Sequence, residues 1–141
     1  MSDKTFVDTN VLIYGHDVDA GEKHDVARNV LRDLWRERTG LLSMQVLQEF
    51  YVNVTRKIAS PLSKEAARLV VNSYSIWCIE TTTHEISEAF RIEDESRIGF
   101  WDSLIVAAAV KGGAARILSE DLNARQVIAG VRVENPFNHL H

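Results

Sequence analysis

Short apolar runs alternate with longer amphipathic ones along the chain, and this alternation predicts successive strand–helix units built around a parallel sheet. Five runs have the length and composition of strands: 5–8, 40–43, 76–79, 115–118 and 131–133. Between them, apolar residues recur at helical spacing over 23–38, 44–57, from 63 onward, over 83–95 and over 102–111. The pattern therefore predicts an α/β fold with about five strands and helices able to cover both faces of the sheet.

Several helix ends can be read from the residues that flank them. Ser43 and Ser63 are each placed to cap a helix, although Ala66 lacks the acid or amide that would complete a capping box after Ser63. The pair Gly112-Gly113 is expected to end the last helix. That helix contains Ala107-Ala108-Ala109, and such small side chains allow it to lie close against the sheet.

Length and composition indicate one globular domain spanning residues 1–141. The chain has 141 residues, of which 45% are hydrophobic and 26% charged, and this suffices for one full core. The longest apolar stretch, Leu104–Val110, is far shorter than the roughly 20 residues of a membrane helix. The start of the chain has no apolar signal region, and the single cysteine, Cys78, lies in an apolar run and is expected in the core. These features predict a cytoplasmic protein without a membrane segment.

The net charge of −4 argues against a general nucleic-acid binder, because phosphate recognition usually requires a basic excess. Acidic residues that converge on divalent metal ions are an exception, since the bound ions reverse the local field and can hold a phosphate. The acidic balance therefore does not exclude phosphodiester chemistry.

Four acidic residues stand where the chain is expected to leave an apolar element: Asp8, Glu49, Asp102 and Asp121. The carboxyl ends of strands form the usual site of an open α/β sheet, so these side chains are expected to meet there. An unpaired buried carboxylate is costly, whereas a cluster around a cation is neutralised. Oxygen ligands without a histidine or cysteine cluster favour Mg²⁺ or Mn²⁺ over zinc.

Each acid also has a simpler interpretation. Asp102 could be an N-cap or first-turn acid of its helix, and Asp121 could cap a short helix. Glu49 flanks the apolar face formed by Val46, Leu47 and Phe50, which predicts partial burial. The case for a shared site therefore rests on the four acids together.

Four segments in order along the chain resemble the PIN-domain nucleases, and within them the VapC-type toxins of toxin–antitoxin pairs. The matching segments are Phe6-Val7-Asp8-Thr9-Asn10-Val11-Leu12-Ile13, Ser43-Met44-Gln45-Val46-Leu47-Gln48-Glu49-Phe50-Tyr51, Phe100-Trp101-Asp102-Ser103-Leu104-Ile105-Val106-Ala107-Ala108-Ala109 and Ile117-Leu118-Ser119-Glu120-Asp121-Leu122. The resemblance covers nearly the whole chain, and it is the order and spacing of the segments that make it specific.

The resemblance implies a three-layer α/β/α sandwich with a central parallel sheet, and Mg²⁺- or Mn²⁺-dependent cleavage of RNA. It makes the four acids the metal ligands and catalytic residues: Asp8, Glu49, Asp102 and Asp121. Asn10 and Ser119 match supporting positions of the family, and the last acid is the most variable position. The resemblance further implies a small antitoxin partner and a homodimer.

Residues directly before Asp102 are candidates for contact with the substrate. Arg97 and Trp101 place a cation and a ring near the acids, where aromatic side chains can stack on unpaired bases. Phe100 and Trp101 could equally close a hydrophobic core.

Two other functions are compatible with parts of the pattern. A phosphatase could use Asp8 as its nucleophile, but such chemistry needs a second acid two residues later, where this chain has Asn10. A phospho-acceptor module, or a scaffold that binds metal or RNA without cutting, is the third reading, and the complete set of acids argues against it.

Overall fold

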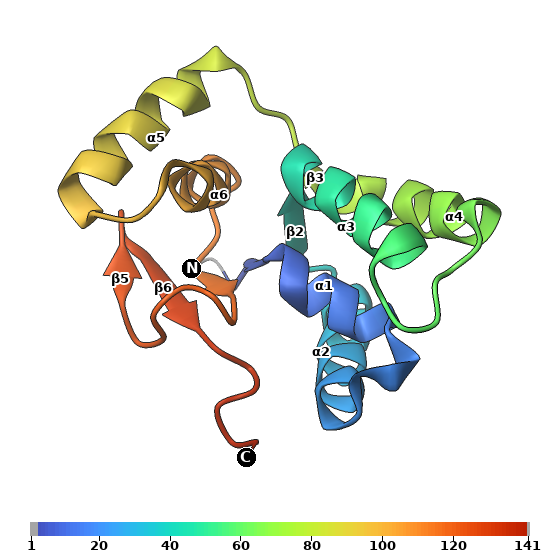
Figure 1. Cartoon of the computed structure of the whole chain (residues 1–141). Coiled ribbons are helices and arrows are strands. Elements are labelled where there is room, and N and C mark those ends of the chain that lie inside the picture. Colours follow the sequence, from blue (N-terminus) through green and yellow to red (C-terminus); the bar gives the residue numbers. More distant parts are fainter. Residues whose placement is uncertain (1–2, 141) are drawn as a thin grey trace.

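A six-stranded sheet in the order β3-β2-β1-β4-β6-β5 forms the centre of the structure (Figure 1). The structure is a computed structural model that describes residues 3–140, so the predicted domain ends at residues 1, 2 and 141 lie outside it. The strands are β1 (Thr5–Val7), β2 (Gly40–Ser43), β3 (Cys78–Ile79), β4 (Arg116–Leu118), β5 (Val127–Ile128) and β6 (Val131–Glu134). All neighbours are parallel except β5, which runs antiparallel to β6.

The five predicted strands are present, with two differences. The third is shorter than predicted, because Ser75–Trp77 form a 3-10 turn before β3. The hairpin partner β5 was not predicted, since two residues carry no readable alternation. Cys78, expected in the core, is half-buried and packs against it.

In the described part of the chain, six α-helices accompany the sheet: α1 (Thr9–His16), α2 (Glu22–Glu37), α3 (Met44–Arg56), α4 (Lys64–Tyr74), α5 (Thr83–Ser96) and α6 (Phe100–Lys111). The caps expected at Ser43 and Ser63 are confirmed, since each hydroxyl accepts a hydrogen bond from a backbone N–H of the first helical turn. Helix α1 was not predicted, and α6 begins at Phe100 rather than Asp102. The first half of the sequence is therefore more helical than its pattern indicates.

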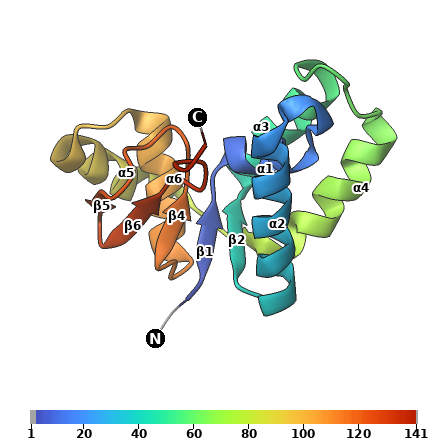
Figure 2. The same ribbon diagram turned by 90° about the horizontal axis from the view of Figure 1, so that it is seen from below.

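The helices form two layers with the sheet between them. Helices α1 to α4 lie on one side, and α5 with α6 lies on the other (Figures 1 and 2). This follows from the strand order: the chain moves outward from β1 to β2 and β3, then returns across the sheet to β4. Right-handed crossovers in opposite directions place their helices on opposite faces. The expected three-layer α/β/α sandwich is thereby confirmed. The strand order reverses between β1 and β4, and functional sites of open α/β sheets lie at such a point.

Helix α6 packs closely on the sheet, against strands β2, β3, β4 and β6. The segment Ile105–Ala109 is buried, and its alanines leave room for this approach. The helix ends as predicted at Gly112-Gly113, where Gly113 has a φ of 74° in the left-handed region. Within residues 3–140, no helix combines the length and apolarity needed to cross a membrane.

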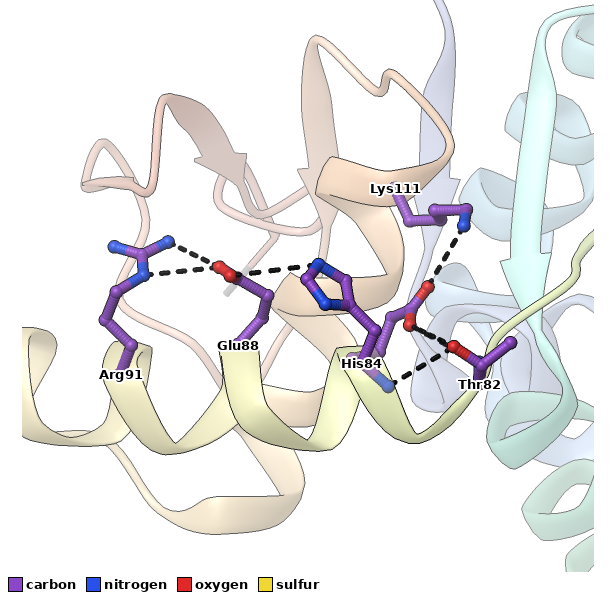
Figure 3. A network of polar contacts seen from close by, with 6 residues as sticks. Thr82, His84, Glu88, Arg91 and Lys111 are labelled. Atoms are coloured by element: carbon purple, nitrogen blue, oxygen red, sulfur yellow. Dashed lines mark hydrogen bonds and ion pairs between the residues drawn. The ribbon is translucent and has the colours of Figure 1, made fainter.

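A polar network joins α5 to α6 (Figure 3). Thr82 and Glu85 form a capping box at the start of α5, and the Glu85 side chain is only 2% exposed. Lys111, at the end of α6, places its Nζ 3.4 Å from Oε1 of Glu85. Burial opposes ionisation of Glu85, but the hydrogen bonds from Thr82 and the charge of Lys111 hold its pKa below the usual value. The contact between Lys111 and Glu85 thus links α5 to α6 within the helical layer on this face of the sheet.

Candidate active site

Asp8 lies at the carboxyl end of β1, next to the carboxyl end of β4. Its backbone N–H donates to the carbonyl of Leu118 at 2.9 Å, which continues the pairing of the two strands. Its side chain is only 7% exposed and caps α1, since Oδ1 accepts from the Thr9 N–H at 2.7 Å. Oδ2 accepts from the buried hydroxyl of Ser119 at 2.8 Å. Asp8 is therefore a buried carboxylate whose two oxygens are both oriented by neighbours.

Glu49 reaches the same region from α3. The hydroxyl of Thr9 donates to its Oε2 at 2.8 Å, and the amide of Gln45 donates to its Oε1 at 3.0 Å. Thr9 therefore connects the two acids, because its backbone N–H donates to Asp8 and its hydroxyl donates to Glu49. Glu49 is exposed, so the partial burial expected from its apolar neighbours is wrong: those neighbours face the core, and Glu49 lies on the outer edge of the helix.

Asp121 lies in the loop that follows β4. The amide of Asn10 donates to its Oδ2 at 2.6 Å. The hydroxyl of Ser119 accepts from the backbone N–H groups of Asp121 and Leu122, both at 3.2 Å. The segment 119–126 contains no helix, so the alternative that Asp121 caps one is wrong. Asp121 is instead linked to α1 through its hydrogen bond with Asn10.

Asp102 approaches from the opposite helical layer. It is the third residue of α6, whose N-cap is Gly99, so it lies in the first turn rather than at the cap. The helix dipole favours a carboxylate at this position. Asp102 is half-buried, and within residues 3–140 no hydrogen bond orients its side chain in the way that Ser119 and Thr9 orient Asp8. Both expected roles, first-turn acid and member of the acid set, are compatible with this position.

The charges of the four acids act on one another. Burial raises the pKa of Asp8 to about 6, against the lowering effect of the Ser119 and Thr9 hydrogen bonds, and the charges of Asp121 and Asp102 raise it further. Burial, followed by the charges of Asp121 and Glu49, also raises the pKa of Asp102. Side chains from four separate elements therefore form one electrostatically coupled group. The fold brings together the acids that the sequence singled out.

The chemistry of the four acids and their neighbours suits a hard divalent cation, although the acids lie farther apart than the ligands of one bound ion. All candidate donors are oxygens of carboxylate, hydroxyl and amide groups, which are the ligands preferred by Mg²⁺ and Mn²⁺. Within residues 3–140, no three acidic, histidine or cysteine side chains stand close enough together to hold one ion as arranged. Mutual repulsion keeps like charges apart, and a cation would reverse that repulsion. The chemistry of the donors therefore fits a divalent metal ion, while their spacing in this structure is wider than that of a closed set of ligands.

The two predicted substrate contacts lie at the start of α6. Trp101 is 65% exposed, so the alternative that it closes the core is wrong for this ring. Phe100 is half-buried and packs between Trp101 and Phe90, with ring centroids 5.2 and 5.8 Å away. Arg97 ends α5 in the left-handed region with a φ of 55° and is exposed. The turn into α6 thus carries the exposed ring of Trp101 and the exposed Arg97, and Asp102 follows Trp101 in the chain.

Residues not singled out from the sequence also belong to the site. Thr9 and Gln45 orient Glu49, and Tyr14 and Lys23 both contact Glu120, the neighbour of Asp121. The four-residue spacing of Asn10 and Tyr14 could have indicated Tyr14, but only if helix α1 had been predicted.

Comparison with known proteins gives a consistent picture. The sequence matches the PIN domain family over residues 5–129. No curated protein matches it significantly. Among solved structures, VapBC2 from Rickettsia felis bound to a promoter DNA fragment has a TM-score of 0.65 at 21% identity, covering 93% of this chain and 97% of that one. DNA-bound VapBC from Salmonella typhimurium gives 0.64 at 20% identity, covering 96% and 99%. The Sarcin-Ricin loop cleaving toxin VapC20 from Mycobacterium tuberculosis gives 0.58 at 17% identity, covering 84% and 90%.

Proposed function

The chain belongs to the PIN domain family, and on that premise we propose that it is a metal-dependent endoribonuclease acting as the toxin of a toxin–antitoxin pair. The observation that carries the proposal is the convergence of Asp8, Glu49, Asp102 and Asp121, from four separate elements, at the point where the sheet reverses direction. The structural likeness to VapC20, a toxin that cleaves the Sarcin-Ricin loop, supports RNA as the substrate.

The cofactor proposed for this site is Mg²⁺ or Mn²⁺, held by the same four acids. Such an ion lowers the pKa of bound water and stabilises charge on a reacting phosphate. The side chains around the acids set their orientation: Ser119 holds Asp8, Thr9 holds Glu49, and Asn10 holds Asp121. These supporting residues bind through hydrogen bonds to one oxygen of each acid. Each of these hydrogen bonds restricts the rotation of its carboxylate.

Single-stranded RNA is the substrate form that the surroundings of the site favour. The exposed ring of Trp101 offers a face on which an unpaired base can stack, and Arg97 offers a cation for a phosphate. Base stacking tolerates any base, so the ring would hold the strand beside Asp102 without reading its sequence. The geometry therefore favours cleavage in unpaired loops.

The proposed partner is a small antitoxin protein that binds the toxin in the cytoplasm, and the proposed assembly is a homodimer. Support for the antitoxin comes from the VapBC structures of Rickettsia felis and Salmonella typhimurium, in each of which the matched chain has this fold over nearly its whole length. A toxin role predicts that expression of the chain alone arrests growth, whereas the Asp8→Asn variant does not.

The direct test is incubation of purified protein with total RNA in Mn²⁺, Mg²⁺ or chelator, beside Asp8→Asn and the exposed-acid control Asp94→Asn. We expect discrete fragments that require metal, that are absent with Asp8→Asn and that persist with Asp94→Asn. Full metal-dependent cleavage by Asp8→Asn would refute the assignment.

The same preparations separate the alternatives. Hydrolysis of a phosphomonoester without RNA cleavage would favour a phosphatase, although Asn10 bonds to Asp121 and cannot supply the proton that such chemistry needs. Metal binding without either activity would favour a scaffold.

A further inference from the structure

Three side chains hold the loop that carries Asp121, and all three come from the helical segment that follows Asp8. Asn10 and Tyr14, four residues apart on one face of α1, contact consecutive loop residues: Asn10 donates to Asp121 at 2.6 Å, and the Tyr14 hydroxyl donates to Oε1 of Glu120 at 2.8 Å. Lys23, in the first turn of α2, forms an ion pair with Oε2 of Glu120. Both oxygens of Glu120 are thus bound, one by each helix.

Aromatic rings fix the position of the Lys23 ammonium group. Its Nζ lies 5.0 Å from the ring centroid of Tyr14 and 5.8 Å from that of Phe137, within the range of cation–π attraction. The two rings meet edge to face with centroids 5.2 Å apart. Lys23 is therefore held on three sides by Glu120, Tyr14 and Phe137, although its side chain is 39% exposed.

The loop is bonded to β6 through its backbone at both ends, at Ser119 and at Arg125 and Gln126, but the backbone of Glu120 and Asp121 makes no such bond to β6 among the contacts within residues 3–140. Residues 119–126 form bends and turns without helix or strand, and the bonds to the Ser119 hydroxyl are the contacts that organise the Asp121 end. Asp121 also faces the like charges of Asp8 and Asp102, which repel it outward. The hydrogen bond from Tyr14 and the ion pair with Lys23 attach Glu120, the neighbour of Asp121, to α1 and α2, and this attachment opposes the repulsion.

We propose that Lys23 is a positioning residue, which acts through Glu120 and with Tyr14 to keep Asp121 beside the other acids. This inference rests on the proposed function, because it assigns to Lys23 the placement of a metal ligand. Lys23 itself touches neither the ion nor the substrate. Its ion pair sets the loop so that the Asp121 carboxylate is available where the ion binds.

The direction in which metal affinity changes when Lys23 is replaced distinguishes a positioning role from a simple charge effect. Removal of a cation near a metal site strengthens metal binding if the cation acts only through space, because repulsion between two positive charges is lost. Removal of a positioning residue weakens metal binding, since the ligand drifts away; partners that orient ligands typically contribute about tenfold or more.

The test is Mn²⁺ affinity by calorimetry without RNA, measured on the wild type, Lys23→Met, Lys23→Arg and the exposed control Lys64→Met. We expect about tenfold weaker binding for Lys23→Met. Lys23→Arg should restore most of the affinity, because its guanidinium can still pair with Glu120, and Lys64→Met should bind like the wild type. Lys23→Met should also lower kcat at limiting Mn²⁺, with recovery at high Mn²⁺ and an unchanged KM for RNA.

The outcomes are distinct. Equal or tighter Mn²⁺ binding by Lys23→Met overturns the inference and leaves the proposed nuclease intact, as does a raised KM with unchanged metal affinity, which would make Lys23 an RNA contact. If the wild type binds no Mn²⁺, the proposed function fails, and amide exchange decides the inference separately. In that case, unchanged exchange of residues 119–122 in Lys23→Met overturns it, and faster exchange supports it.

Discussion

Asp8 should be a destabilising residue in the metal-free protein, and Asp8→Asn should make that protein more stable at neutral pH. The pKa of Asp8 is about 6 in the folded protein, against an ordinary value of 3.8. At about 1.4 kcal/mol per pKa unit, ionised Asp8 lowers the free energy of unfolding by about 3 kcal/mol at pH 7.5. The effect shrinks as pH falls through 6, because the folded protein then takes up the proton first; at pH 4.5 about 1 kcal/mol remains.

Asparagine is a close match for the protonated acid. The protonated acid and the amide each have one acceptor oxygen and one donating group. Asp8 is surrounded by two donors, the Thr9 N–H and the Ser119 hydroxyl, so one contact is mismatched in either case and its cost cancels in the comparison. Asp8→Asn is therefore expected to raise the free energy of unfolding by up to about 3 kcal/mol at pH 7.5, and by about 1 kcal/mol at pH 4.5.

The assay is urea unfolding followed by tryptophan fluorescence in EDTA, at both pH values, with Asp94→Asn as an exposed-acid control. The control should change stability by less than about 0.5 kcal/mol at either pH. Mn²⁺ at 100 times its dissociation constant should then stabilise the wild type by about 2.7 kcal/mol and the variant by much less. A variant that is less stable at pH 7.5, or equally shifted at both pH values, would refute the reasoning.

Three further variants test other parts of the structure. Lys111→Met removes the cation beside buried Glu85, so the urea midpoint should fall at pH 7; because the pKa of Glu85 is lowered in the fold, the difference should shrink as pH drops below the ordinary value of 4.5. Trp101→Ala should raise the KM for RNA about fivefold or more with little change in kcat, measured on a fluorescent RNA oligonucleotide. Gly40→Ala puts a methyl group 2.5 Å from the buried ring of Trp77 and should lower the free energy of unfolding by about 1 to 3 kcal/mol in urea.

Matched controls exist for each of these variants. Lys64→Met removes an exposed lysine and should leave the urea midpoint unchanged at both pH values. Ile76→Ala truncates another exposed apolar residue and should leave KM unchanged, so an equal rise in KM would contradict base stacking. Gly99→Ala adds a methyl group that meets no atom within 4 Å, and its cost as a helix cap should stay below about 1 kcal/mol.

The sequence predicted the fold where periodicity was long and failed where it was short or unusual. The helices at 44–57 and 83–95 follow clear apolar spacing, and both are present. Helix α1 was missed because β-branched Val11 and Ile13, together with Gly15, disfavour helix; it forms because Asp8 caps it and its buried residues pack in the core. Tertiary packing outweighed local preference.

The candidate site shows the same division. The four acids could be named from the sequence because strand ends meet at one edge of a parallel sheet. Of the residues that orient them, Asn10 and Ser119 were named through the resemblance. The contacts of Lys23 with Glu120 and of Thr9 with Glu49 could not be predicted, since the partners are far apart in sequence and no local pattern relates them. The burial of Asp8, which sets its pKa, likewise appears only after folding.

The strand order has a consequence for how the protein folds during its synthesis on the ribosome. The proposed ligands span residues 8 to 121, β4 stands between β1 and β6, and Phe137 completes the support of Lys23. A ribosome produces Asp8 and Glu49 early, but the central position of β4 stays vacant until much later residues emerge. Under the proposed function, a nascent chain carries two of the four acids until Asp102 is made and three until Asp121 is made, so we expect it not to cut RNA. Under that function, the protein therefore cannot cut RNA near its own site of synthesis until nearly all of the sequence described here has been made.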